Sequence, residues 1–243
     1  MNPRTLLGVL TPSSNTVLEP LTARMLHELP DVSAHFGRLR VTEISLGQKA
    51  LGQFDRAPFM DAARLLADGR VQSIIWSGTS SGWRGFEDDV QLCKAIRDET
   101  GIAASSSVLA LNEVFEKTGV RNFGLVTPYL DEVQDRIVEN YREAGYRCVA
   151  ERHLGDKGNF SFSEYSEDCI ADMVRAVAAE QKIDAVAIFC TNLRGTRIAA
   201  ELEQELGIPI YDSIATGVWK GMQLAGADPS RLRSWGSLFS QVR

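Results

Sequence analysis

The chain has 243 residues, which is long enough for one large domain or two small ones. Hydrophobic residues make up 44% and charged residues 24%, ordinary proportions that exclude a disordered chain. The net charge of −6 leaves no basic surface for nucleic acid, and no apolar run approaches the roughly 20 residues of a membrane-spanning helix.

The first predicted strand covers residues 6–10, and a helix is predicted at 16–27. The polar loop between them runs through Pro12, Ser13, Ser14 and Asn15. Free N–H groups at a helix N-terminus, together with hydroxyl and amide side chains, form an anion-binding site. An ordinary N-cap by Asn15 or Thr16 is the simpler interpretation, because capping needs only one such residue.

A second strand is predicted at residues 73–76 and a helix at 86–100. The connecting loop is rich in glycine and hydroxyl groups and contains Ser77, Gly78, Thr79 and Ser80. Glycine permits close approach of the backbone to a ligand, and successive N–H groups form a nest for an oxyanion. A flexible polar turn has a similar composition. The loop lacks the GxxxxGK[ST] pattern of a P-loop.

A third strand at residues 123–126 leads through Tyr129 into a helix at 130–144. The Tyr129 hydroxyl is positioned to reach a bound carboxylate, or the ring simply packs beside Pro128. Asn159 lies in a loop at residues 155–164, whose composition suits either a cover over a cleft or a plain turn.

The fourth strand, residues 185–189, ends at Cys190, which is followed by Thr191, Asn192 and a helix at 196–206. Near a helix N-terminus the thiolate of Cys190 is stabilised and the sulfur exchanges protons with a carbon acid, although most such cysteines are inert. The other cysteines are Cys93 and Cys169, in helical patterns, and Cys148, in a short strand. Without a CxxC pair, the sequence predicts neither a metal site nor a disulfide framework, and a cytoplasmic location is expected.

Three pairs of segments repeat in the same order along the chain. They begin at Gly8 and Gly124, at Ile74 and Ala187, and at Gly101 and Gly207, with Gly78 matched to Cys190. The repeats predict an α/β fold of two parallel-sheet lobes related by a pseudo-twofold axis, one of residues 1–115 plus 216–243 and one of 116–215. The active site is then expected in the cleft between the lobes, where the carboxyl ends of the strands meet. Two unrelated α/β halves are the alternative.

The motifs together resemble the aspartate/glutamate racemase superfamily, in the branch of maleate cis-trans isomerases and arylmalonate decarboxylases. The resemblance rests on Pro-Ser-Ser-Asn-Thr-x-x-Glu-Pro at 12–20, on Thr-Pro-Tyr at 127–129 and on the strand that ends in Cys190. It implies an enzyme that needs no cofactor and no metal and that acts on a small carboxylate. It also implies substrate-binding roles for Asn15, Tyr129 and Asn159.

Racemases and maleate isomerases of this superfamily carry one cysteine in each half, whereas here Gly78 occupies the first position. Gly-Thr-Ser at 78–80 is similar to arylmalonate decarboxylases, in which a single cysteine protonates the intermediate. The resemblance therefore implies a lyase that forms an enediolate from a small dicarboxylate, with Cys190 and Gly78 as the catalytic positions. The expected substrate-binding residues are Pro12, Ser13, Ser14, Asn15, Thr79, Ser80, Tyr129, Asn159, Thr191 and Asn192.

Four alternatives remain at this point. Maleate-type isomerisation or racemisation is disfavoured, because one thiol serves one face of a substrate. An enzyme of the related ectoine-degradation branch is a third alternative. A binding protein for organic acids that has lost its chemistry is the fourth. A homo-oligomer is compatible with the sequence, whereas nucleic acid and membrane partners are not expected.

Overall fold

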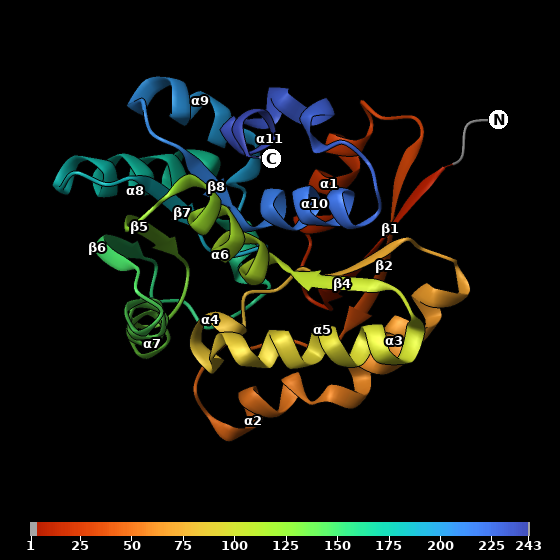
Figure 1. The fold of residues 1–243 in the computed structure, drawn as a ribbon. Coiled ribbons are helices and arrows are strands. Elements are labelled where there is room, and N and C mark those ends of the chain that lie inside the picture. Colours follow the sequence, from red (N-terminus) through yellow and green to blue (C-terminus); the bar gives the residue numbers. More distant parts are fainter. Residues whose placement is uncertain (1–3, 243) are drawn as a thin grey trace.

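Residues 4–242 are described in a computed structural model, which contains two four-stranded parallel sheets. The strand order is β2-β1-β3-β4 in the first sheet and β6-β5-β7-β8 in the second, so the second half repeats the topology of the first. Figure 1 shows the two sheets with helices on their faces. The predicted α/β fold of two similar parallel-sheet lobes is confirmed.

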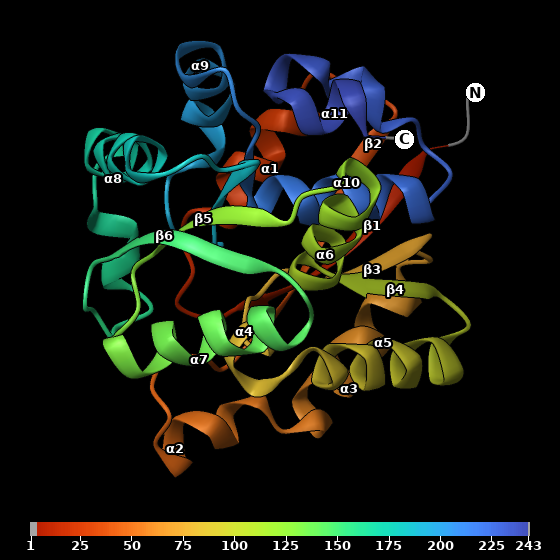
Figure 2. The same cartoon turned by 60° about the vertical axis from the view of Figure 1, so that its left-hand side comes forward.

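The elements of the first half are built around four strands. These are β1 (Thr5–Pro12), β2 (Val32–Leu39), β3 (Ser73–Trp76) and β4 (Ala103–Ser106). Their helices are α1 (Leu18–Leu26), α2 (Gln48–Leu51), α3 (Arg56–Asp68), α4 (Ser81–Arg84), α5 (Phe86–Thr100) and α6 (Ser107–Thr118), with a 3-10 turn η1 (Gly52–Phe54). Helices α3 and α5 cover one face of this sheet, and α1 and α10 lie on the other (Figure 2).

The second half repeats this plan. Its strands are β5 (Asn122–Thr127), β6 (Arg147–His153), β7 (Ala185–Ile188) and β8 (Ile210–Asp212). Its helices are α7 (Asp131–Glu143), α8 (Glu167–Glu180), α9 (Thr196–Leu206), α10 (Ser213–Leu224) and α11 (Ser237–Gln241), with 3-10 segments η2 (Ser161–Glu164) and η3 (Pro229–Trp235). All four strands and all four helices predicted above exist, and the ends of each lie within two residues of the expected positions.

A hydrophobic core joins the two halves. It includes Leu7 and Val9 of β1 together with Leu125 and Val126 of β5, all buried. Burial of each such side chain contributes roughly 1.5–3 kcal/mol, so the halves stabilise one another. Helix α10 packs on β3 and β4 of the first sheet, although it follows β8 in the chain. The exact lobe boundaries, residues 1–115 plus 216–243 and 116–215, stay a prediction.

Within residues 4–242, no helix combines the length and the apolar character that crossing a membrane requires. The same range contains no group of three or more His, Cys, Asp or Glu side chains arranged to hold a metal ion.

Candidate active site

The segments that follow β1, β3, β5 and β7 meet between the two sheets. Thr79 follows β3, Tyr129 follows β5 and Cys190 follows β7. The Thr191 hydroxyl donates across the halves to the Ser77 carbonyl at 3.1 Å. The carboxyl ends of these parallel strands thus bring together residues that are 50 or more positions apart in the chain.

Cys190 is the thiol at this meeting point and is only 3% exposed. The Asn192 N–H donates to its sulfur at 3.3 Å, and the Tyr129 hydroxyl also hydrogen-bonds to it. Burial nevertheless raises the pKa of Cys190 to about 12, because these donors offset only part of the desolvation. The expected stabilised thiolate is therefore corrected: helix α9 begins only at Thr196, and the sulfur is a neutral thiol near pH 7.

Tyr129 connects the thiol to the first half. Its hydroxyl lies 2.6 Å from the Thr79 hydroxyl, and the two residues are buried. Burial raises the pKa of Tyr129 well above its usual value, so the phenol stays neutral and able to donate. Edge contacts with Trp83 and Phe162, at centroid distances of 5.2 and 5.6 Å, fix the ring. Thr79, Tyr129 and Cys190 therefore form one hydrogen-bonded chain.

Two asparagines from opposite halves close the start of α1. Asn15 Oδ1 accepts from the N–H groups of Val17 and Leu18 at 3.0 and 2.9 Å. Asn192 Oδ1 accepts from the Thr16 and Val17 N–H groups at 3.0 and 3.2 Å. These oxygens accept the N–H groups at the start of α1, as a capping residue would, although the N-cap position is Val17 and not the predicted Asn15 or Thr16. A role of Asn15 and Asn192 in substrate binding stays a prediction.

The remaining amide groups of this cluster join the halves further. Asn15 Nδ2 donates to the carbonyl and the hydroxyl of Thr191 at 2.9 and 3.2 Å. Asn192 Nδ2 donates to the Asn159 carbonyl, and Asn159 Nδ2 donates to Ser14 Oγ at 2.8 Å. The predicted binding residues Ser14, Asn15, Asn159, Thr191 and Asn192 thus form a single network.

The loop that contains Asn159 crosses to the first half. Its Asn159 N–H donates to the Thr42 carbonyl at 3.2 Å, and the Lys157 carbonyl accepts from the Ile44 N–H at 2.8 Å. This placement is compatible with the predicted cover over the site. Ser13, whose hydroxyl accepts from the Val41 N–H at 3.2 Å, and Pro12, at the end of β1, lie at the edge of the same region.

Comparison with known proteins identifies the family. A model of the arylmalonate decarboxylase family matches residues 52–239, which is more than half of the chain. The chain belongs to this family. It is 27% identical to arylmalonate decarboxylase from Bordetella bronchiseptica, with 97% of this chain and 96% of that protein covered. It is also 19% identical to maleate isomerase from Geobacillus stearothermophilus, with 88% and 89% covered.

The solved structures agree on the fold. The crystal structure of the maleate isomerase Iso from Pseudomonas putida S16 matches with a TM-score of 0.87 at 18% identity, covering 98% of each chain. The resemblance to the maleate isomerase and arylmalonate decarboxylase branch is therefore confirmed. The protein is a decarboxylase or isomerase of that branch.

Two residues near the site were not predicted from the sequence. Asp212, at the end of β8, is buried, and burial raises its pKa to about 7. Its Oδ1 accepts from the Thr196 hydroxyl at 2.6 Å, while Oδ2 has no partner among the described residues. Trp76, the last residue of β3, donates from Nε1 to Ser80 Oγ at 3.3 Å. The repeated segment that ends at Asp212 was the signal that could have pointed to this aspartate. Trp76 lies in an apolar strand, and no pattern in the sequence marked it as a functional residue.

Proposed function

We propose that the protein decarboxylates a small substituted malonate-type dicarboxylate and that Cys190 protonates the resulting enediolate. The observation that carries this proposal is the hydrogen-bonded chain of Thr79, Tyr129 and Cys190. It places a neutral thiol beside two hydroxyl groups at a buried site. Membership of the arylmalonate decarboxylase family supports the same chemistry.

The reaction balances with the groups of this chain. Cleavage of the bond to one carboxylate releases CO2 and leaves its electron pair as an enediolate on the other carboxylate. Hydroxyl donors such as Thr79 and Tyr129 stabilise that charge in place, which is usually the largest catalytic contribution. Cys190 gives its proton to the carbon on one face, and the thiolate then recovers a proton from water. The high pKa of Cys190 favours this recovery.

Isomerisation of a maleate-like substrate is the second candidate, because the chain is also related to a maleate isomerase. Addition of sulfur to a double bond needs a thiolate, whereas burial keeps Cys190 protonated. Racemisation needs an acid or base on each face. Gly78 stands at the expected first cysteine position, and Cys93, Cys148 and Cys169 lie in α5, β6 and α8. Decarboxylation fits the single neutral thiol best.

A substrate panel in D2O tests the proposal. Phenylmalonate, methylmalonate, maleate and an optically active 2-arylpropionate are incubated with the protein and followed by NMR. We expect CO2 release from a malonate and one deuterium on the product carbon. Cys190→Ser removes the acidic proton donor and should lower this rate at least 100-fold. The matched control, Cys169→Ser on the outer helix α8, should leave it unchanged.

Each competing reaction has its own signature in this panel. Conversion of maleate to fumarate without CO2 would identify an isomerase, and deuterium exchange into the 2-arylpropionate with loss of optical activity would identify a racemase. Binding of a dicarboxylate without turnover of any compound would support the organic-acid-binding alternative. If no member binds or reacts, the substrate lies elsewhere, as for an enzyme of the ectoine-degradation branch.

A further inference from the structure

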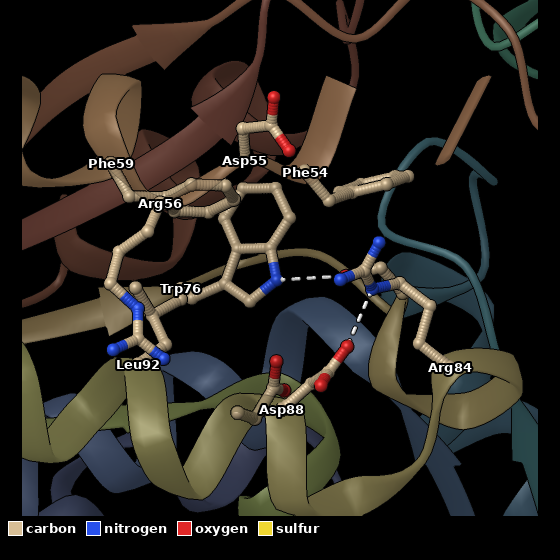
Figure 3. A pocket seen from close by; sticks show the side chains of 10 residues that line it. Phe54, Asp55, Arg56, Phe59, Trp76, Arg84, Asp88 and Leu92 are labelled. Carbon is tan, nitrogen blue, oxygen red and sulfur yellow. Dashed lines mark hydrogen bonds and ion pairs between the residues drawn. The ribbon is translucent and has the colours of Figure 1, made fainter. Parts of the chain in front are cut away.

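Trp76 lies directly behind the loop that carries Gly78, Thr79 and Ser80. Its indole is 1% exposed, and the Phe59 ring of α3 packs on it edge to face, with 4.8 Å between centroids and 82° between planes. A cavity of about 220 Å³ borders the indole and is also lined by Phe54 and Ser80. Figure 3 shows the indole in the wall of this cavity, with its N–H turned toward the Arg84 side.

The indole N–H sets the direction of the Ser80 hydroxyl. Because indole nitrogen is only a donor, Ser80 Oγ must accept the 3.3 Å hydrogen bond from Trp76. The hydroxyl hydrogen of Ser80 then remains for another acceptor. The hydrogen bonds within residues 4–242 include no acceptor for it, so this hydrogen is available to a ligand. Ser80 is only 5% exposed, so the interaction is shielded from water.

The same indole leaves no room for a side chain at position 78. A Cβ built on Gly78 would lie 2.1 Å from Cζ2 and 2.5 Å from Cε2 of Trp76. Such contacts are far inside van der Waals distance, so the ring or the backbone would have to move. Phe59 and the burial of the indole oppose a movement of the ring.

We propose that Trp76 is a positioning residue with two effects: it orients Ser80 for an anion, and it reserves position 78 for glycine. The site can then hold only one thiol, Cys190, and a proton reaches the substrate from one side. The role of Ser80 as a carboxylate ligand rests on the proposed function. The restriction at position 78 does not, because it follows from the packing of the free protein.

A stability cycle tests the restriction at position 78. Gly78→Ala should lower the Tm by roughly 4–10 °C in the natural background, because overpacking of a core is destabilising. In a Trp76→Leu background the same change should cost less than about 2 °C. Trp76→Met provides a second background, since methionine fills irregular gaps and keeps the variant folded.

Two results would overturn the restriction. An equal loss of Tm in both backgrounds would mean that the indole is not what excludes the side chain. No loss from Gly78→Ala in the natural background would mean that the ring moves freely, for instance into the neighbouring cavity.

A kinetic cycle tests the orientation of Ser80, with phenylmalonate as the probe. Trp76→Phe removes the N–H but keeps an aromatic ring against Phe59, and it should lower kcat/KM about tenfold. In a Ser80→Ala background the same change should have less than a twofold effect, because the oriented hydroxyl is already gone. Trp235→Phe is the control: it removes an indole hydrogen bond to Glu28 at the surface and should leave kcat/KM unchanged.

Equal effects of Trp76→Phe in both backgrounds would reduce Trp76 to a packing residue and overturn its role toward Ser80. Absence of phenylmalonate turnover in the natural protein would instead count against the proposed function. The stability cycle would still decide the restriction at position 78, so the two failures are distinguishable.

Discussion

Burial determines which chemistry the Cys190 sulfur can perform. An exposed thiol near a helix N-terminus is partly ionised near neutral pH, but this one is almost fully buried and its pKa is raised to about 12. A neutral thiol is an acid, and an acid is what an enediolate requires. The nearby Tyr129 hydroxyl then serves as a donor to the sulfur once the proton has left.

The pH dependence of turnover follows from this raised pKa of Cys190. Between pH 8 and 10 the thiol remains protonated, so kcat/KM for decarboxylation of phenylmalonate should stay level. Steady-state CO2 release across this range is the measurement. A rate that rises tenfold per pH unit would show that the reactive form is the thiolate, and the acid role of Cys190 would be wrong.

The contribution of the Tyr129 hydroxyl to catalysis can be separated from the packing of the Tyr129 ring. Tyr129→Phe retains the edge contacts with Trp83 and Phe162 and removes the donor beside Thr79. Loss of one such donor should lower kcat roughly 100- to 1,000-fold, whereas the Tm should fall by only about 2–6 °C, because the buried Thr79 hydroxyl loses one partner. Tyr146→Phe is the control, because that ring packs against Phe115 and the Arg121 guanidinium outside the site. Similar activity in both variants would remove Tyr129 from the reaction.

Among the elements, the N-terminus of α1 depends on both halves of the molecule. Asn15 caps it from its own loop, and Asn192 accepts two of its N–H groups from the other half. In the opposite direction, the side-chain nitrogen of Asn15 in the first half donates a hydrogen bond to the Thr191 carbonyl in the second half. The residues that satisfy the N-terminus of this helix therefore also connect the two halves.

A stability measurement distinguishes this join from an ordinary cap. Asn15→Ala loses the cap and leaves the buried Thr191 carbonyl without its donor, so it should lower the free energy of unfolding by about 2–3 kcal/mol. Ser166→Ala removes only the cap of α8, where the serine accepts from the Cys169 N–H, and should cost about 1 kcal/mol. Urea unfolding provides both values. Equal losses would contradict a joining role for Asn15.

Local patterns account for the elements that could be predicted. Strand β3 and helices α5 and α9 have the expected bounds, because an unbroken apolar run marks the first and periodic apolar residues mark the helices. Strand β2 was not predicted, since this edge strand is half exposed and carries His35 and Arg38. The contact of Asn15 with Thr191 could not be predicted either, because only the tertiary fold joins positions 176 residues apart.

At the scale of the whole molecule, the duplicated halves bury one carboxyl group each at equivalent places. In the first half Ser106 caps α6 and its hydroxyl meets Asp89 of α5. In the second half the capping residue is Asp212 itself, and its partner is the hydroxyl of Thr196 on α9. Burial raises the pKa of Asp89 to about 6 and that of Asp212 to about 7. The fold therefore holds two acids that titrate near neutral pH.

These raised pKa values make folding stability depend on pH with a defined sign. An acid whose folded pKa is raised favours the native state below its unfolded pKa, and that contribution is lost as pH rises through the folded pKa. For Asp212 the window runs from about pH 4 to about 7, and the loss is on the order of 4 kcal/mol. Urea unfolding of the natural protein at pH 4.5, 6 and 7.5 should show this decline.

Asp212→Asn should reduce that decline and leave only the part due to Asp89, because the amide keeps the oxygen that accepts from Thr196 and from the start of α10 but cannot ionise. Asp228→Asn is the matched control. Ser230 lowers the pKa of the Asp228 carboxyl, so its stabilisation disappears only as pH falls below the window, and the decline should persist in that variant. A decline unchanged by Asp212→Asn would mean that Asp212 is ionised in the native state across this window, and its charge would then add to the burial that raises the pKa of the Cys190 thiol.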